Sequence, residues 1–275
     1  MSPCFIRRLT PDGLQPVDYS AASLAEAAQY ESADGVYTVA NTFNTYQVLM
    51  FDAHLDRLEN SAKYAGIPLN LNREYLRKNL RAMIEQADFG SVRFRITVER
   101  DNPESLLLSL EPYHPPSAEL IEHGVKCATV ADNHRVNPVV KTTDWMHNRK
   151  QITLPADVYE GLLIDDAGNI LEGMSSNFYA VLAGELRTAK EGVLQGIARR
   201  IVVEIAPSVL PVKWQPVNLN DLAHISEALM TSSSRGIIPI VQIDDVTIGA
   251  GKRGPITESL QQAYNQWVAQ HLEDL

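Results

Sequence analysis

The spacing of apolar residues predicts two helices and two strands in the first half of the chain. Apolar side chains recur at helical spacing in residues 53–66 and again in residues 72–87. Residues 91–100 alternate apolar and polar side chains, which is typical of a strand with one apolar and one polar face. Residues 106–110 are predicted to be its partner strand. The helical positions are Leu55, Leu58, Ala62, Leu76, Leu80, Met83 and Ile84.

A hairpin is predicted ahead of these helices, in residues 34–51. Its first part is rich in residues that favour strands, and Asn44–Gln47 offers a turn before the short apolar run that begins at Val48.

The second half of the chain is also mixed. Strands are predicted at residues 125–130, 161–164, 178–182 and 228–231, and helices at residues 197–205 and 257–272. The proline-rich stretch at residues 112–118 marks a connection. We therefore predict a smaller N-terminal α/β domain (residues 1–116), an interdomain connection (residues 117–124) and a larger C-terminal α/β domain (residues 125–275) that carries Lys141.

Composition narrows the classes of partner. The chain has 275 residues, is 45% hydrophobic and carries a formal charge of −10, with no run of Lys or Arg longer than two residues. This gives no electrostatic footprint for nucleic acid or an anionic membrane, so a small-molecule substrate is expected. Cys4 and Cys127 are far apart and the first residues lack a signal peptide's apolar core, which favours a cytoplasmic protein. No metal site is predicted.

Three charged residues are candidates for chemistry. Lys141 follows Val139 and Val140, so it is expected to end a short strand with its amine directed into a cleft. Glu172 is expected at a tight turn next to polar groups, and Arg57 at the edge of a helix's apolar face. Each also has an ordinary reading: a solvated lysine, a turn glutamate in water and a surface arginine.

Two segments have the composition of anion sites. Gly196 precedes a predicted helix, whose first backbone amides form a natural site for phosphate. Residues 231–236 supply hydroxyls and turn amides after a strand. Together with a lysine, a carboxylate and an arginine, these two anion sites suit a phosphorylated aldehyde cofactor.

The chain resembles the fold-type IV pyridoxal-phosphate enzymes, the class IV aminotransferases that include branched-chain and D-amino acid aminotransferases and 4-amino-4-deoxychorismate lyase. The resemblance runs from about Asp34 to near the carboxyl terminus. The separation of Lys141 from Glu172 resembles the family's, whereas Lys150 lies closer to Glu172. The matching segments, in the family's order, are residues 34–39, 54–58, Lys141, 171–173 with Asn177, 194–197, and 231–234 with Pro239.

The resemblance implies a two-domain α+β or α/β fold like that of D-amino acid aminotransferase, with the cofactor between the domains, and a homodimer. It implies a PLP-dependent aminotransferase of amino acid metabolism that moves an amino group between an amino acid or amine and a 2-oxo acid. Lys141 would form an aldimine with pyridoxal 5'-phosphate and then shuttle a proton. Glu172 would pair with the pyridine nitrogen. The other cofactor residues implied are Arg57, Leu194, Ile197, Ala198 and Ser233.

The implied substrate-binding residues are Tyr37, Thr38, Arg95 and Ser234. The loop at residues 100–104 lacks the carboxylate-binding Arg-x-His pair of D-amino acid aminotransferases, which argues against their substrates. Trp145 and Met146 stand where branched-chain enzymes carry a tyrosine, which argues against theirs.

Two alternatives to an aminotransferase stay open. Thr38 matches a threonine of the lyase, so elimination of pyruvate from 4-amino-4-deoxychorismate is one of them. A non-catalytic PLP-binding protein is the other, and the intact Lys141 and Glu172 argue against it. Arg235 is unusual for the subfamilies and is interpreted as a contact to a carboxylate or a partner subunit, or as surface packing.

Overall fold

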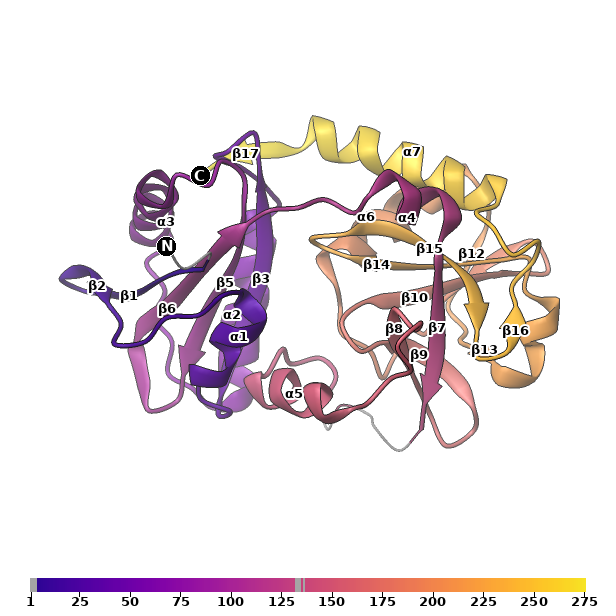
Figure 1. Cartoon of the computed structure of the whole chain (residues 1–275), viewed down its shortest axis with the longest axis horizontal. Coiled ribbons are helices and arrows are strands. Elements are labelled where there is room, and N and C mark those ends of the chain that lie inside the picture. Colours follow the sequence, from indigo (N-terminus) through magenta and orange to yellow (C-terminus); the bar gives the residue numbers. More distant parts are fainter. Residues whose placement is uncertain (1–3, 132–134, 136) are drawn as a thin grey trace. The chain divides into compact units, whose positions relative to one another are not determined.

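The computed structural model describes residues 4–131, 135 and 137–275 (Figure 1). The chain divides into two compact units. Unit 1 comprises Met1–His114, Val140–Ile152 and His271–Leu275, and unit 2 comprises Pro115–Val139 and Thr153–Gln270. Lys141 therefore belongs to unit 1 in this division, whereas the sequence placed it in the predicted C-terminal domain, residues 125–275. The domain boundary at residues 117–124 stays a prediction.

Among the described residues, unit 1 contains a seven-stranded antiparallel sheet. Its order is β17-β4-β3-β5-β6-β1-β2. The predicted hairpin at residues 34–51 is confirmed, because β3 and β4 pair around a turn in which Asn44 and Thr45 have positive φ. The strands are β1 (Phe5–Thr10), β2 (Gly13–Pro16), β3 (Gly35–Phe43), β4 (Gln47–Leu49), β5 (Val92–Glu99), β6 (Asn102–Pro112) and β17 (Leu272–Asp274).

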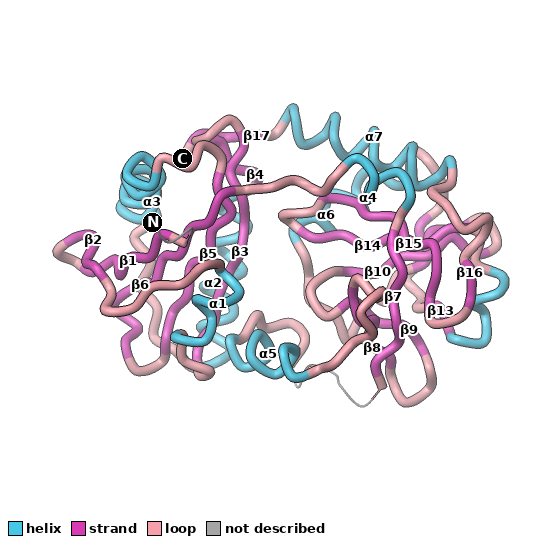
Figure 2. Tube along the Cα trace, in the orientation of Figure 1, coloured by secondary structure: helices cyan, strands magenta, loops and turns pink. Residues whose placement is uncertain are grey.

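Two helices cover one face of this sheet (Figure 2). They are α2 (Phe51–Ala65) and α3 (Arg73–Ala87), which confirms both helices expected from the apolar spacing. The Asn72 side chain accepts a hydrogen bond from the Tyr75 amide and so caps α3, while Gly66 ends α2 in a left-handed conformation. The apolar side of each helix packs into the same core as the apolar side of β5.

Most of the polar face of β5 is buried: Arg95, Thr97 and Glu99 are buried, and Arg93 is exposed. A segment containing α1 (Leu24–Ala27) and the 3₁₀ helix η1 (Ala28–Tyr30) covers this side of the sheet. Arg95 donates to both carboxylate oxygens of Glu31 and to the Leu24 carbonyl. The alternation of β5 was predicted correctly, but most of its second face also lies against protein, where Arg95 and Thr97 bond to the covering segment.

Among the described residues, unit 2 contains a ten-stranded sheet in the order β12-β11-β10-β14-β15-β7-β8-β9-β13, with β16 paired to β15. An added pairing of β9 with β10 closes β7, β8, β9, β10, β14 and β15 into a ring. Most pairs are antiparallel, while β15 with β7, β7 with β8 and β11 with β12 are parallel. The strands are β7 (Val125–Val130), β8 (Glu160–Ile164), β9 (Asn169–Gly173), β10 (Asn177–Leu182), β11 (Glu185–Arg187), β12 (Val212–Lys213), β13 (Val217–Asn218), β14 (Glu227–Ser232), β15 (Gly236–Ile243) and β16 (Val246–Thr247).

The remaining helices differ in how well the sequence predicted them. The helix at residues 197–205 is confirmed as α6 (Ile197–Ile205), and the last helix, α7, covers Pro255–Gln270 and packs against α6, β14 and β15. The predicted connection instead contains α4 (Ala118–His123). The others are α5 (Thr143–Asn148), η2 (Arg149–Gln151), η3 (Ala206–Ser208) and η4 (Leu219–His224). Within the described ranges, no helix combines the length and apolar character needed to cross a membrane.

Candidate active-site residues

Lys141 lies in unit 1 beside the first part of β3, which β4 leaves unpaired. The Tyr37 amide donates to the Lys141 carbonyl at 3.0 Å, and the Lys141 amide donates to Ser61 Oγ on α2 at 3.2 Å. The ammonium nitrogen is 4.6 Å from the centre of the Tyr37 ring, within cation–π range. Val139 and Val140 form a turn and a bend, so the expectation that Lys141 ends a strand is wrong. Lys141 is instead a half-buried residue whose backbone is held on both sides.

Lys150, the competing lysine, has a different environment. It is exposed, in η2, and its ammonium donates to the Ala25 carbonyl at 2.6 Å. Partial desolvation of its amine lowers its pKa, with further contributions from the positive charges of Arg95 and Arg149. Its amine therefore fastens the segment around α1 within unit 1.

Tyr37 and Thr38, both predicted to contact substrate, lie on opposite faces of β3. In the register with β5, Tyr37 pairs with Thr97 and Thr38 pairs with Ile96. Tyr37 thus shares a face with Arg95, while Thr38 faces α2. All three side chains are buried, and Arg95 is engaged by Glu31. Their substrate roles stay predictions.

Thr38 connects Arg57 to a buried histidine. Arg57 donates to Thr38 Oγ1 at 3.0 Å, and Thr38 Oγ1 lies 3.0 Å from His54 Nδ1. Arg57 Nη2 also lies 3.4 Å from His54 Nδ1, and because a guanidinium can only donate, Nδ1 is assigned as the acceptor and the histidine proton to Nε2. Burial, followed by the charges of Arg57 and Lys141, holds the pKa of His54 well below its ordinary value. His54 therefore stays neutral and orients Arg57 through Thr38.

Acidification is expected to destabilise the protein through His54. Below the ordinary histidine pKa of 6.5 the unfolded chain binds a proton that the folded chain does not, so stability present above pH 6.5 is lost as pH falls towards the folded-state pKa. The loss approaches about 1.4 kcal/mol for each pH unit. Urea unfolding between pH 7 and pH 5.5 should show a smaller loss for His54→Gln than for the parent.

The matched control is His224→Gln, because His224 is exposed at the end of η4. Its pH dependence should follow the parent's. Equal slopes for His54→Gln and the parent would show that His54 titrates in the folded protein as it does in the unfolded chain.

Glu172 is a buried residue of β9 in unit 2, 2% exposed, and not the turn residue that the sequence suggested. Its Oε2 accepts from the Leu194 amide at 3.0 Å and from Asn177 Nδ2 at 3.4 Å. Asn177 also donates to the Leu194 carbonyl at 2.8 Å. The carboxylate is therefore fixed between β10 and the residues that precede α6.

Arg135 is the residue that the sequence did not single out. Its Nε lies 3.0 Å from Glu172 Oε1, and both side chains are almost fully buried. Such a pair forms only when the desolvation of each charge is offset by the other. Arg135 occurs in the stretch before Lys141, but nothing in its local sequence indicates a contact with a residue so far along the chain.

The start of α6 is built around Asn177 and Gly196. Gly196 is the N-cap and brings no side-chain hydrogen bond of its own, and a helix leaves its first amides without intrahelical acceptors. A Cβ at Gly196 would overlap the side-chain oxygen of Asn177, so glycine is required there. Leu194, Ile197 and Ala198, predicted as cofactor residues, are all buried at this place.

The strand pairing places residues 231–236, the second predicted anion segment, next to the strands that carry Glu172 and Asn177. Asn177 pairs with Glu172 on one side and with Thr231 on the other. Ser233 and Ser234 follow in the turn between β14 and β15. Unit 2 thus brings Glu172, the start of α6 and this serine turn to neighbouring strands, whereas Tyr37, Thr38, Arg57, Arg95 and Lys141 belong to unit 1.

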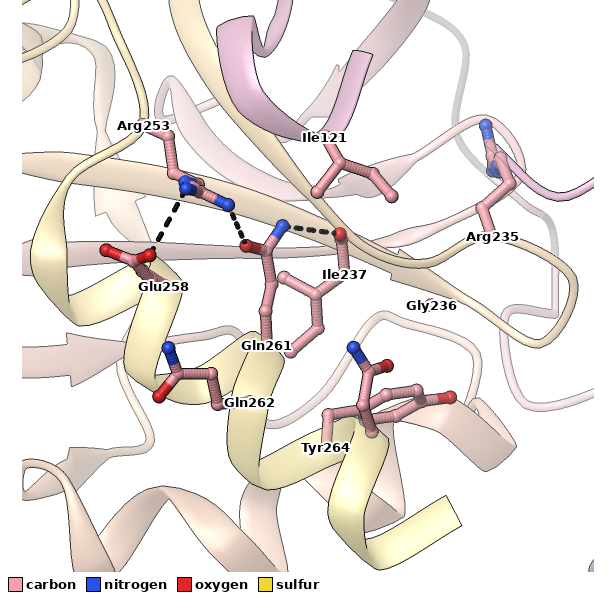
Figure 3. Close-up of a pocket in the computed structure, with 10 residues that line it drawn as sticks. Ile121, Arg235, Gly236, Ile237, Arg253, Glu258, Gln261, Gln262 and Tyr264 are labelled. Carbon is pink, nitrogen blue, oxygen red and sulfur yellow. Dashed lines mark hydrogen bonds and ion pairs between the residues drawn. The ribbon is translucent and has the colours of Figure 1, made fainter. Parts of the chain in front are cut away.

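Unit 2 also contains a cavity of about 180 Å³ between β15 and α7 (Figure 3). It contains none of the predicted catalytic or cofactor residues. Arg253 donates to Gln261 at 3.2 Å, and Gln261 donates to the Ile237 carbonyl at 3.1 Å, so these polar groups bond to one another across the wall. Because this cavity holds none of those residues, the candidate site is defined by the predicted catalytic and cofactor residues and not by the cavity. Among the described residues, no group of three or more His, Cys, Asp or Glu side chains is arranged to hold a metal ion.

Comparison with known proteins gives concordant matches. The family described as "Amino-transferase class IV" matches residues 35–243. D-alanine aminotransferase of Bacillus licheniformis is 28% identical over 250 residues, covering 85% of this chain and 87% of that protein. A T.th. branched-chain amino acid aminotransferase, solved with pyridoxamine 5'-phosphate, superposes with a TM-score of 0.83 at 19% identity over 98% of this chain and 97% of its own. The branched-chain aminotransferase of Thermoproteus uzoniensis, solved with norvaline, gives 0.79 at 20% identity over 98% of both chains.

Proposed function

This chain belongs to the class IV aminotransferases, which use pyridoxal phosphate. We propose that it transfers an amino group between an amino acid or amine and a 2-oxo acid, and that Lys141 and Glu172 are the residues that catalyse this transfer. The observation that carries the proposal is the position of Lys141. Its backbone is fixed to β3 and α2, and its amine lies half-buried over the Tyr37 ring. This is the placement of a reactive amine rather than a solvated surface lysine.

Glu172 and Lys141 are each proposed to act on a different part of the cofactor. Bound pyridoxal phosphate supplies a ring that accepts the electrons left when a proton leaves the substrate's α-carbon. Glu172, held by Arg135 and the Leu194 amide, would keep a negative charge beside the pyridine nitrogen. Lys141 would hold the cofactor and would move the proton at the α-carbon.

The phosphate is assigned to the start of α6, with Ile197 and Ala198, and to Ser233, helped by Arg57. Backbone amides at a helix start and a serine hydroxyl both donate to phosphate oxygens. Leu194 would pack against the ring face. Gly196 supports the assignment, since this N-cap residue has no side chain that could accept from the first amides of α6 in place of an anion.

The donor is proposed to be an amino acid or amine. The similar proteins include a D-alanine aminotransferase and branched-chain aminotransferases, whose names give amino acids as substrates. Arg95 can take a substrate carboxylate only in competition with Glu31. Tyr37 and Ser234 are the other substrate residues proposed.

The position of Thr38 does not favour the lyase reaction. The lyase alternative rested on this threonine, and its hydroxyl is fully buried between Arg57 and His54. That position gives it a role in orienting Arg57. A homodimer in the cytoplasm is also proposed, on the family resemblance and the composition.

The function is tested with paired enantiomers of small amino acids and amines as donors and a set of 2-oxo acids as acceptors. Transamination predicts one equivalent of keto product for each equivalent of aminated acceptor, quantified by chromatography. Release of pyruvate from 4-amino-4-deoxychorismate without a donor, and no amination across the panel, would identify the lyase instead.

A further inference from the structure

A buried ion pair in unit 2 is not used by the proposed chemistry. Arg235, the last residue of the serine turn between β14 and β15, donates from Nη1 to Glu160 Oε2 at 2.6 Å. The Glu160 side chain is 5% exposed, at the start of β8, and that of Arg235 is 22% exposed. Unlike the surface pairs of this unit, this one therefore excludes most water.

The second oxygen of Glu160 holds the turn that follows Glu172. Oε1 accepts from the Ser175 amide at 2.6 Å and from the hydroxyls of Ser175 and Ser176 at 3.0 Å each. A Cβ at Gly173 would overlap both Ser176 Oγ and Glu160 Oε1, so the packing here is tight. Glu160 thus fixes residues 173–176 directly after the proposed cofactor carboxylate.

The other nitrogens of Arg235 connect this turn to the serine turn. Nε donates to Ser232 Oγ at 2.8 Å, and Nη2 donates to Ser175 Oγ at 2.9 Å and to the Ser175 carbonyl at 3.2 Å. One guanidinium therefore joins the end of β14, the start of β8 and the turn between β9 and β10. Lysine cannot reproduce this arrangement, because it lacks the planar set of donors.

The charges of the pair stabilise each other. Burial alone would raise the pKa of Glu160, but the charge of Arg235 and the hydrogen bonds from Ser175, Arg235 and Ser176 outweigh it, so the pKa lies below its ordinary value. Burial would likewise lower the pKa of Arg235, but Glu160 and, after it, Tyr159 outweigh this, so the pKa lies above its ordinary value. Both groups stay charged, and the positive charge of Arg235 is already neutralised by Glu160.

We propose that Arg235 and Glu160 are positioning residues that hold the Ser232–Ser234 turn in the conformation that receives the cofactor phosphate. This rests on the proposed function, in which Ser233 is a phosphate contact. Arg235 acts through the turn, since its donors are occupied by Glu160, Ser175 and Ser232. Arg235 is therefore proposed to position the turn and not to contact a substrate carboxylate.

The test compares pyridoxal phosphate with pyridoxal, which lacks the phosphate. The full-length protein, dialysed free of cofactor, is titrated with each, and the two dissociation constants are measured by fluorescence. Arg235→Gln should weaken pyridoxal phosphate binding by about tenfold or more while changing pyridoxal binding less than about twofold. A merely structural defect would weaken both.

Arg253→Gln is the matched control. Arg253 and Arg235 line the same cavity and appear at opposite ends of the residues drawn in Figure 3, but Arg253 bonds to Gln261 and Glu258 on α7. This variant should keep the parent's affinity for both compounds.

A second variant covers the case in which an unpaired Glu160 prevents folding. Arg235→Gln combined with Glu160→Gln leaves no isolated buried charge, and it should keep the phosphate-specific loss. Parent-like binding of pyridoxal phosphate by this double variant would overturn the proposal. The proposal would also be overturned if Arg235→Gln left the ratio of the dissociation constants for pyridoxal phosphate and pyridoxal unchanged and raised the KM for the 2-oxo acid. That result would make Arg235 a substrate contact. A parent that binds neither compound would instead refute the proposed function.

Discussion

Replacing Lys141 by alanine is expected to lower amino transfer on the order of 10³-fold or more and to remove the visible absorbance of the covalently bound cofactor. The variant has no amine to bond to the cofactor and no group to move the proton at the substrate's α-carbon. The fold should persist, because the backbone contacts to Tyr37 and Ser61 do not involve the lysine side chain. Initial rates and an absorbance spectrum of the purified protein measure both effects.

Lys150→Ala is the control for this variant. It removes the hydrogen bond to the Ala25 carbonyl and should leave the spectrum and the rate near those of the parent. Visible absorbance that survives in Lys141→Ala and disappears in Lys150→Ala would transfer the proposed role to Lys150.

Replacing Glu172 by glutamine is expected to lower kcat on the order of 10²-fold, with a much smaller change in cofactor affinity. The negative charge proposed to lie beside the pyridine nitrogen is lost, so the ring should accept electrons less readily, while the proposed phosphate contacts are unchanged. The substitution also leaves Arg135 without its buried partner, which should cost about 3–5 kcal/mol of stability. Steady-state kinetics, cofactor titration and urea unfolding separate these three effects.

Glu185→Gln is the matched control, since it is the same change in the same unit. Glu185 pairs with Arg187 and Lys213 at a partly exposed position on β11. Exposed pairs contribute little, so kcat and stability should stay close to the parent's. A Glu172→Gln protein with parental kcat would remove the carboxylate from the proposed chemistry.

Local patterns were sufficient to predict much of the fold. The helical spacing of Leu55, Leu58 and Leu76 and the cap at Asn72 depend on neighbours within a few residues, and both helices form where expected. By contrast, β17 was missed because its three residues gain strand structure from pairing with β4, more than 200 residues earlier in the chain. The burial of Arg95 was missed for the same reason, since its partner Glu31 lies on a segment distant in sequence.

The candidate site shows the same division. Lys141, Glu172 and Gly196 stand in motifs that can be read from the sequence, and the structure gives each a fixed environment. Arg135 was missed because an arginine that pairs with Glu172 has no sequence signature apart from the contact itself. The connections made by Arg235 were also hidden, because Glu160 resembles any residue at the start of a strand until β8 and the serine turn are placed together.

The central claim, that Lys141 is the residue that binds the cofactor, is tested most directly by reducing the parent protein with borohydride in the presence of pyridoxal phosphate. Digestion and mass spectrometry then locate the fixed adduct. We expect one phosphopyridoxyl group per chain, on the peptide that contains Lys141. An adduct on Lys150, or no adduct on any lysine, would contradict the account.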